Sequence, residues 1–154
     1  MTATITITNP ILSGMYPDPS WIWDDEFQRI VLVTSTFELV PGLPIYVSED
    51  MTCWKHASNV IDADLARRLL IPFVDDSGGV YAPTLRRIHG KYVIACTIAR
   101  LDDRRAMEGG CTESELMRFH AAEGNFILEA DSIEGPWRGP FWIEGAEGIE
   151  DRKS

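Results

Sequence analysis

One acidic residue lies in a setting that could aim its carboxylate at a reacting group. Asp18 is flanked by Pro17 and Pro19 in the run YPDPS, residues 16–20. Proline fixes its own φ and restricts the residue before it to extended conformations, so this segment is stiff. A carboxylate held in this way suits general acid–base chemistry, which needs a positioned proton acceptor. Asp is also common in ordinary turns, so the tripeptide alone leaves both interpretations open.

The other residue types that perform chemistry show no such arrangement. The cysteines are Cys53, Cys96 and Cys111. They form no CxxC pair and no Cys/His set at metal-ligand spacing, so we expect no metal and no cofactor. Their odd, scattered number fits a reducing compartment. Ser35 and Thr36 lack the Gly-x-Ser-x-Gly setting of a nucleophilic serine, which gives a serine hydrolase no support.

Composition and charge limit what kind of molecule positions Asp18. The chain has 154 residues, a length typical of one domain. It carries 14 Lys plus Arg against 24 Asp plus Glu, and this charge of −10 argues against nucleic acid and anionic membranes as partners. Residues 1–8 lack a signal-peptide pattern, and no apolar run approaches the length of a membrane helix. We therefore expect a soluble, cytoplasmic protein.

Most of the chain is predicted to form short strands between turn signals. The expected strands cover residues 30–35, 44–48, 54–61, 80–85, 91–97, 125–130 and 137–143. Residues 62–70 instead have apolar side chains at helical spacing, with Asp62 or Asp64 as the N-cap. The charged residues 101–124 are interpreted as a solvated surface loop. A helix is expected there only between Thr112 and Ala122, where a capping box fits.

An internal repeat divides the chain into two units. The matched pairs are residues 18–20 with 82–84, 30–33 with 92–95, 45–50 with 126–131, and Trp54 with Trp137. The offset between the copies is 64 and 62 for the first two pairs and 81 and 83 for the last two. The insertion at 101–124 explains the change. Each unit then holds about four short strands, which is typical of a β-propeller blade.

The number of units conflicts with a complete propeller. Propellers usually have about four to eight blades, and five blades need roughly 250 residues. Two blades alone leave sheet faces uncovered. We therefore expect a chain that is part of a larger protein, assembles with copies of itself, or is only marginally folded. Trp54 and Trp137 recur in both units and are expected to be buried packing residues.

Four blocks of sequence, in order along the chain, resemble glycoside hydrolase family 43, in particular its β-xylosidase branch. They are NPILSGMYPDPS (9–20), VTSTFELVPGLPIYVS (33–48), SGGVYAPT (77–84) and GNFI (124–127), and EGPW (134–137) is similar to the end of the family's second blade. The resemblance covers about residues 9 to 149. It implies a five-bladed propeller with an axial sugar pocket and inverting glycoside hydrolysis, in which one carboxylate activates water and one carboxylic acid protonates the leaving oxygen.

The resemblance also implies roles for individual residues. Asp18 is the expected general base, and Phe37 is the expected aromatic wall of the sugar subsite, with Tyr81 and Ala82 as further substrate-binding positions. Core packing remains an open alternative for Phe37 and Tyr81. Glu150 is a weak candidate for the carboxylate that orients the acid, because the Pro-Ser that follows this position in the family is missing. The general acid belongs to a later blade, so none is expected in this chain.

These observations lead to one set of predictions. The fold class is all-β, as the first two blades of a truncated five-bladed β-propeller. The expected divisions are an N-terminal segment 1–9, blade 1 at 10–61, a connector 62–79, blade 2 at 80–147 with the inserted loop 101–124, and a tail 148–154. The expected function is hydrolysis of O-glycosidic bonds in xylan- or arabinan-derived oligosaccharides, by a fragment that is inactive alone. The alternative is a non-catalytic carbohydrate-binding or interaction module. Self-association through uncovered blade faces is also expected.

Overall fold

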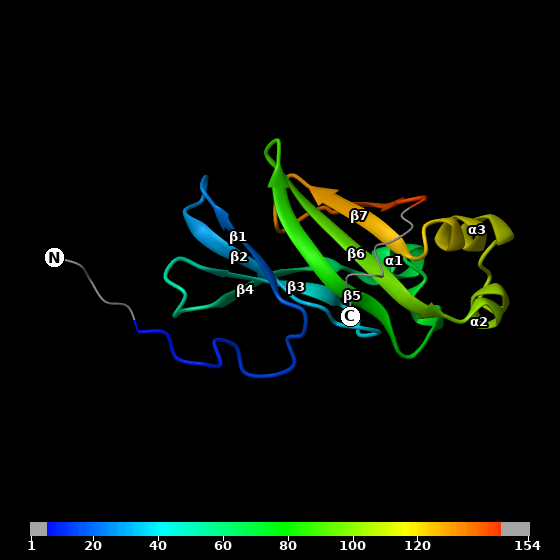
Figure 1. Ribbon diagram of the computed structural model, residues 1–154, viewed down its shortest axis with the longest axis horizontal. Helices are drawn as coiled ribbons and strands as arrows, with labels where there is room; N and C mark the ends of the chain where they lie inside the picture. The colour runs from blue at the N-terminus through cyan, green and yellow to red at the C-terminus, as the bar shows by residue number, and fades with distance from the viewer. Residues whose placement is uncertain (1–5, 146–154) are drawn as a thin grey trace.

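The computed structural model describes residues 6–145, which form two four-stranded antiparallel sheets (Figure 1). The first sheet has the order β1-β2-β3-β4, with β1 Ser20–Asp24, β2 Arg29–Val33, β3 Gly42–Ser48 and β4 Lys55–Ile61. The second has the order β5-β6-β7-β8, with β5 Val74–Ile88, β6 Lys91–Leu101, β7 Asn125–Ala130 and β8 Arg138–Trp142. Each strand pairs with its neighbour in sequence, as in a propeller blade. The expected tail at 148–154, with Glu150, lies outside the described residues.

The strand register confirms the internal repeat. In the first sheet Trp21 pairs with Leu32, and in the second Leu85 pairs with Ile94. These positions are related by the two offsets found in the sequence, so the β1–β2 and β5–β6 hairpins are equivalent. β1 is not among the predicted strands, although its Trp-Ile-Trp run consists of residue types that favour strands.

The fifth strand is longer than its apolar run predicts. β5 begins at Val74, inside the segment expected as a connector, and its pairing with β6 is interrupted between Val74 and Gly79 and between Tyr81 and Thr84. β-Bulges of this kind let a strand continue through turn-forming residues, and they re-aim side chains next to functional sites. The second interruption contains Ala82, one of the expected substrate-binding positions.

The predicted helix at 62–70 is confirmed. α1 Ala63–Arg68 begins after Asp62, whose carboxylate accepts a hydrogen bond of 2.8 Å from the backbone N–H of Leu65. This bond satisfies one of the N–H groups that a helix start leaves without a partner. A short 3₁₀ turn, η1 Ile71–Phe73, leads from α1 into β5.

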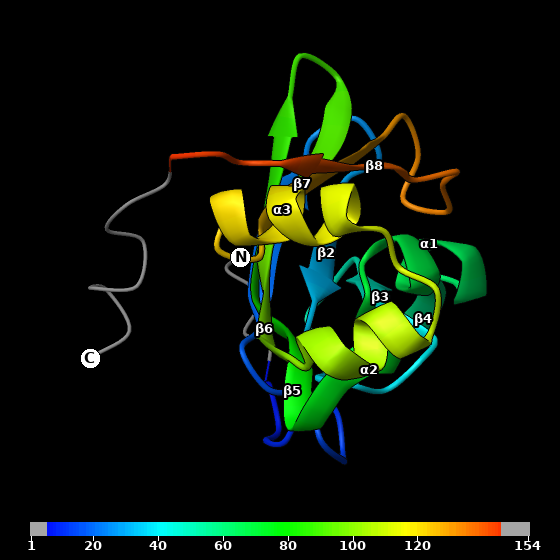
Figure 2. The ribbon, with the colours of Figure 1, turned by 90° about the vertical axis from the view of Figure 1, so that its right-hand side faces the viewer.

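The interpretation of residues 101–124 as a solvated loop is wrong. The segment folds into two helices, α2 Asp103–Glu108 and α3 Glu113–Ala121, which lie with α1 at one end of the molecule (Figure 2). The predicted Thr112 capping box at the start of α3 is present. Ala106 and Phe119 are only 0% and 6% exposed, so both helices bury an apolar side. Because most residues of the segment are polar or charged, this narrow apolar stripe gives only a weak signal in the sequence.

The hydrophobic core lies mainly between the two sheets. It contains alternate residues of the central strands, including Val31 and Val33 from β2 and Ile94 and Ile98 from β6, all at most 2% exposed. Alternation of this kind buries one face of a strand against the neighbouring sheet. Within residues 6–145, none of the helices combines the length and apolarity needed to span a membrane.

A polar cluster joins the two sheets at the outer end of β1. The fully buried carboxylate of Asp24 is paired with the Arg87 guanidinium and accepts a hydrogen bond from the Tyr92 hydroxyl. Arg87 also pairs with Glu26. Burial, with a smaller contribution from the bond to Asp24, raises the pKa of Tyr92. These contacts link β1 to β5 and β6, which are separated by more than sixty positions in the sequence.

The two repeated tryptophans have equivalent positions but unequal burial. Each lies directly before the last strand of its sheet, Trp54 before β4 and Trp137 before β8. Trp137 is 9% exposed, whereas Trp54 is only half-buried and borders an open groove. The prediction of equal burial is therefore wrong. The second sheet packs on the first, whereas no strand of residues 6–145 packs against the corresponding face of the first sheet.

Candidate functional site

The candidate base lies at a junction between the two sheets. The Ser35 hydroxyl donates a hydrogen bond of 2.7 Å to Oδ2 of Asp18 and accepts one of 2.9 Å from the backbone N–H of Ala82. That N–H also lies 3.4 Å from Oδ2. Asp18 and Ala82, which are equivalent positions in the repeat, are thus brought together through one buried serine.

Local structure fixes each member of this junction. Ser35 lies two residues after the end of β2, is 1% exposed, and donates its backbone N–H to the carbonyl of Pro17 at 2.9 Å. Asp18 and Ala82 adopt φ angles of 51° and 45°, in the left-handed region that non-glycine residues rarely occupy. Such conformations persist only where the surrounding structure imposes them, and they cluster at functional sites.

The residue before the proline run is also anchored to the sheet. The Tyr16 ring packs edge-on against Tyr46 of β3 with centroids 5.4 Å apart, and their hydroxyls are 3.3 Å apart. Burial, followed by the hydrogen bond with Tyr16, raises the pKa of Tyr46 to about 12. Tyr46 therefore stays neutral at ordinary pH, and its contact with Tyr16 anchors the segment that carries Asp18 to the sheet.

The two expected aromatic residues contact each other beside this junction. Phe37 forms an isolated antiparallel bridge with Val80, with N–O distances of 3.2 and 2.9 Å. The rings of Phe37 and Tyr81 are then 4.8 Å apart. Gly79 allows this close approach, because a Cβ at that position would lie 2.3 Å from the carbonyl oxygen of Phe37. Both rings are half-buried, so each packs on the protein and presents a remaining face to solvent.

The carboxylate of Asp18 is accessible. The residue is exposed, and within residues 6–145 its Oδ1 atom accepts no hydrogen bond. One oxygen is therefore held by Ser35 while the other can receive a proton from a water molecule. Among the described residues, no group of three or more His, Cys, Asp or Glu could hold a metal ion. The expectation of a cofactor-free site stays a prediction.

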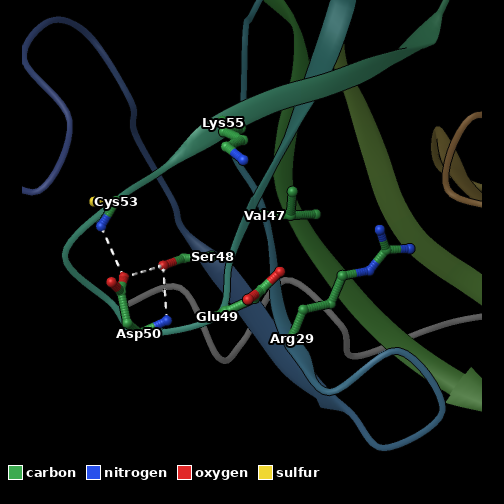
Figure 3. A pocket seen from close by; sticks show the side chains of 7 residues that line it. All are labelled: Arg29, Val47, Ser48, Glu49, Asp50, Cys53 and Lys55. Atoms are coloured by element: carbon green, nitrogen blue, oxygen red, sulfur yellow. Dashed lines mark hydrogen bonds between the residues drawn. The ribbon is translucent and has the colours of Figure 1, made fainter.

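A hollow separate from the Asp18 junction lies near the start of β2, at the end of this strand that is farther from Ser35. It is lined by Arg29, Val47, Ser48, Glu49, Asp50, Cys53 and Lys55 (Figure 3). The carboxylate of Asp50 in this hollow already has hydrogen-bond partners within the protein. Its Oδ1 atom accepts hydrogen bonds of 2.8 Å from the backbone N–H groups of both Thr52 and Cys53. These bonds, the one from Cys53 first, lower the pKa of Asp50. The hollow is thus the outside of a β3–β4 turn, and it shares no residue with the Asp18 junction.

Sequence reasoning identified four residues of the junction and missed one. Asp18, Phe37, Tyr81 and Ala82 are brought together, while Glu150 lies outside the described residues. From its residue type alone, Ser35 is a candidate only for a nucleophile. Its position inside the 33–48 block was a signal that it belonged to the site, but its distance along the chain from Asp18 gave no indication of a contact.

The fold and this junction define the class of protein to which the chain belongs. Two equivalent antiparallel four-stranded sheets, packed face to face and carrying an exposed aspartate with two aromatic rings at their joint, are adjacent blades of a β-propeller. The sequence model of Glycosyl hydrolases family 43 matches residues 7–151. The chain belongs to this family, and the predicted fold class is confirmed.

Individual relatives agree with this assignment. A non-reducing end alpha-L-arabinofuranosidase of Bacteroides ovatus is 36% identical over 143 residues, which cover 90% of this chain and 22% of the relative. A xylan 1,3-beta-xylosidase of a Vibrio species is 33% identical over 142 residues, or 91% of this chain and 23% of the relative. A solved structure of a family 43 protein from Bacteroides ovatus matches with a TM-score of 0.69 and 33% identity, over 90% of this chain and 23% of that one. The chain thus spans less than a quarter of each.

Proposed function

We propose that this chain supplies the general base and part of the sugar subsite of a glycosidase that hydrolyses O-glycosidic bonds in xylan- or arabinan-derived oligosaccharides. The observation that carries the proposal is the junction at Asp18: one carboxylate oxygen is held by Ser35, the other is accessible, and an aromatic pair lies beside it. Family membership and the names of the relatives support the substrate class.

In the proposed reaction Oδ1 of Asp18 takes a proton from water as that water attacks the anomeric carbon. Ser35 stabilises the carboxylate and fixes its orientation through Oδ2. Phe37, supported by Tyr81, offers an aromatic face to the C–H face of a pyranose or furanose ring. The backbone N–H of Ala82 holds the Ser35 hydroxyl oxygen, which directs the hydroxyl proton toward Asp18.

Inversion requires a second carboxyl group on the opposite side of the sugar. Roughly 6.5–9.5 Å separates the two groups in inverting enzymes, so that a water fits beside the base. In the family resemblance this acid lies on a later blade, and Glu150 remains a weak candidate for the carboxylate that orients it. General acid assistance typically contributes about 10²–10⁴-fold to the rate. The chain alone is therefore proposed to lack turnover of unactivated substrates.

Binding and turnover of the purified chain test the proposal together. Titration with xylobiose or an arabino-oligosaccharide, followed by ¹H–¹⁵N spectra, should shift the amide signals of Phe37, Tyr81 and Ala82. Phe37→Ala should remove these shifts, whereas Phe141→Ala, at a 50% exposed ring on β8, should not. Xylobiose should stay intact. Residual hydrolysis of an activated aryl xyloside, which needs less leaving-group protonation, should disappear in Asp18→Asn.

Two outcomes would contradict the assignment. Sugar-induced shifts confined to residues away from the junction would show that this is not the subsite. Hydrolysis that is equal in the wild-type chain and in Asp18→Asn would exclude Asp18 as the base.

A non-catalytic carbohydrate-binding module is the second candidate. It is favoured by the position of the aromatic pair, which lies wholly within the described residues and needs no acid to hold a sugar. Binding at Phe37 with no turnover of even the activated glycoside, in this chain and in any longer protein containing it, would support this alternative.

A further inference from the structure

A cysteine of β6 lies opposite the second interruption of β5. β6 runs directly beside β5 (Figure 1), and the pairs on either side of the interruption are Tyr81 with Thr97 and Thr84 with Ala95. Residues 82 and 83 of β5 are therefore opposite a single residue of β6, Cys96. This is the two-against-one pairing of a β-bulge.

The side chain of Cys96 is buried and makes a polar contact. Cys96 is 6% exposed and lies between Ile94 and Ile98, on the buried side of β6. Its thiol donates a hydrogen bond to the backbone carbonyl of Tyr81, with Sγ and O 2.9 Å apart. A buried cysteine otherwise packs like a small apolar residue. An aliphatic side chain could fill this position but could not donate this bond.

The carbonyl of Tyr81 and the N–H of Ala82 belong to the same peptide group. This peptide is not among the cis bonds of the chain, and a trans peptide is planar, with its C=O and N–H pointing in opposite directions. The thiol of Cys96 thus binds one end of the plane, and Ser35, whose hydroxyl oxygen accepts the N–H at 2.9 Å, binds the other. A rotation of the plane would weaken both bonds together.

The backbone at Ala82 favours such a rotation. Its φ angle of 45° lies in the left-handed region, which is disfavoured for a residue with a Cβ atom. A change in φ of Ala82 turns the preceding peptide plane about the N–Cα bond. The two hydrogen bonds at opposite ends of that plane therefore oppose the relaxation of Ala82.

The hydrogen bonds also run in one direction, from the thiol to the candidate base. Cys96 donates to the carbonyl of Tyr81, and the N–H of the same peptide donates to Ser35. The Ser35 hydroxyl in turn donates to Oδ2 of Asp18 at 2.7 Å. Hydrogen bonds connected in this way polarise one another, so each donor is strengthened by the one before it.

We propose that Cys96 is a positioning residue for Asp18. Its thiol fixes the peptide between residues 81 and 82, and this peptide directs the Ser35 hydroxyl toward the carboxylate. The same peptide carries the Tyr81 ring, which lies 4.8 Å from Phe37, so the thiol supports the aromatic pair as well. The inference rests on the proposed function, in which Asp18 is the general base.

Replacement of the thiol tests this series of contacts by nuclear magnetic resonance of the purified chain. In Cys96→Ala, the amide hydrogen of Ala82 should exchange about fivefold faster relative to that of Ile94, as expected for the loss of one hydrogen bond. The ¹³C signal of the Asp18 carboxylate should move at constant pH. Cys96→Ser keeps a donor at this position, so both signals should stay near their wild-type values.

Two further variants separate the hydrogen bond from packing. Cys111→Ala is the matched control, because Cys111 is also buried, at 5% exposed, but lies before α3 and contacts Arg67. It should leave the exchange of Ala82 relative to Ile94 unchanged. Cys96→Val fills the position without a donor and should reproduce the result of Cys96→Ala. It replaces that variant if the smaller side chain prevents folding.

Four results would overturn the proposal. Unchanged exchange of Ala82 in Cys96→Ala and Cys96→Val would show that the thiol does not hold the peptide. Faster exchange without a change in the Asp18 signal would show that the peptide does not act on the carboxylate. A folded Cys96→Ser that behaves like Cys96→Ala would attribute the effect to packing, and an equal effect in Cys111→Ala would attribute it to global stability.

None of these measurements needs a sugar or turnover. Their failure is therefore distinguishable from failure of the proposed function, which equal hydrolysis of the activated glycoside by the wild-type chain and Asp18→Asn would contradict.

Discussion

A buried hydroxyl makes the shortest hydrogen bond to the carboxylate of Asp18. Ser35 bridges the carboxylate and the N–H of Ala82, while its own N–H binds the carbonyl of Pro17. Phe37, two residues farther on, joins Asp18 and Ala82 in having a positive φ, at 53°. Such backbone conformations cost on the order of 1–3 kcal/mol each. The site is therefore held by contacts between residues that are locally strained, and loss of one contact should affect the others.

We expect Ser35→Ala to lower the free energy of unfolding by about 1–2 kcal/mol, because the substitution leaves the N–H of Ala82 and one oxygen of Asp18 without their closest partner. Urea unfolding would measure this change. Ser13→Ala, at an exposed serine in the N-terminal segment, is the control and should leave the midpoint unchanged. Equal stability of the two variants would mean that Ser35 does not hold the junction.

The helices at the end of the second sheet are built from strong local signals. In α3 the Thr112 side chain accepts the N–H of Glu115, and the Glu115 carboxylate accepts the N–H of Thr112 at 2.7 Å. Leu116 and Phe119 of this helix pack in the hydrophobic core, where they are 9% and 6% exposed. Because a short helix is marginal without tertiary contacts, the cap and the packing depend on each other.

Thr112→Ala should therefore destabilise the protein by about 1 kcal/mol, the usual cost of removing a threonine N-cap. Hydrogen exchange of the α3 amides, together with urea unfolding, would detect it. Ser114→Ala, in the same first turn but outside the capping box, should have no destabilising effect. Faster exchange in Ser114→Ala than in Thr112→Ala would contradict this account.

The capping box of Thr112 and Glu115 also makes a pH-dependent contribution to the stability of the protein. Hydrogen bonds from Thr112, the one from its backbone N–H first, lower the pKa of Glu115 from 4.5. A carboxyl group whose pKa falls on folding stabilises the native state above its unfolded pKa, and this stabilisation is lost as the pH drops through the folded value. Glu115→Gln should thus be less stable than the wild type at neutral pH, and the difference in unfolding midpoint should disappear in acid below pH 4.5. A constant difference would show that charge is not involved.

The whole molecule depends on the joint between its two sheets. Asp24 is completely buried, and its compensating charges come from Arg87 and, at 3.9 Å, Arg29. Removing one partner of a buried ion pair leaves an uncompensated charge in a poorly solvated place. Glu26, the other ion-pair partner of Arg87, is itself negatively charged and therefore cannot compensate the charge of Asp24.

Arg87→Ala should accordingly reduce the free energy of unfolding by about 3 kcal/mol. Chemical denaturation followed by tryptophan fluorescence would measure it, since Trp23 lies close to Arg87 at the rim of a shared hollow. Arg104→Ala, at an exposed residue of α2, should change stability little. A loss for Arg87→Ala no larger than that of the control would show that the sheets are joined by apolar packing alone.

Much of the architecture was readable from local patterns. Alternating and β-branched runs predicted most strands, Asp62 predicted the start of α1, and the matched offsets predicted two equivalent sheets. These features depend on a residue and its near neighbours, so they are present in the sequence. α2 and the buried side of α3 were missed, because a stripe of few apolar residues is diluted in a charged segment.

The sequence by itself determined the repeat, the family and the identity of Asp18, Phe37, Tyr81 and Ala82 as candidates, because each rests on residue types and their order. Only the tertiary structure decided that Ser35 holds Asp18, that Gly79 admits the backbone of Phe37, and that Trp54 is open where Trp137 is covered. These outcomes depend on contacts between residues far apart in the chain, and on which face of a sheet meets its neighbour. Packing sets both, and no local pattern encodes them.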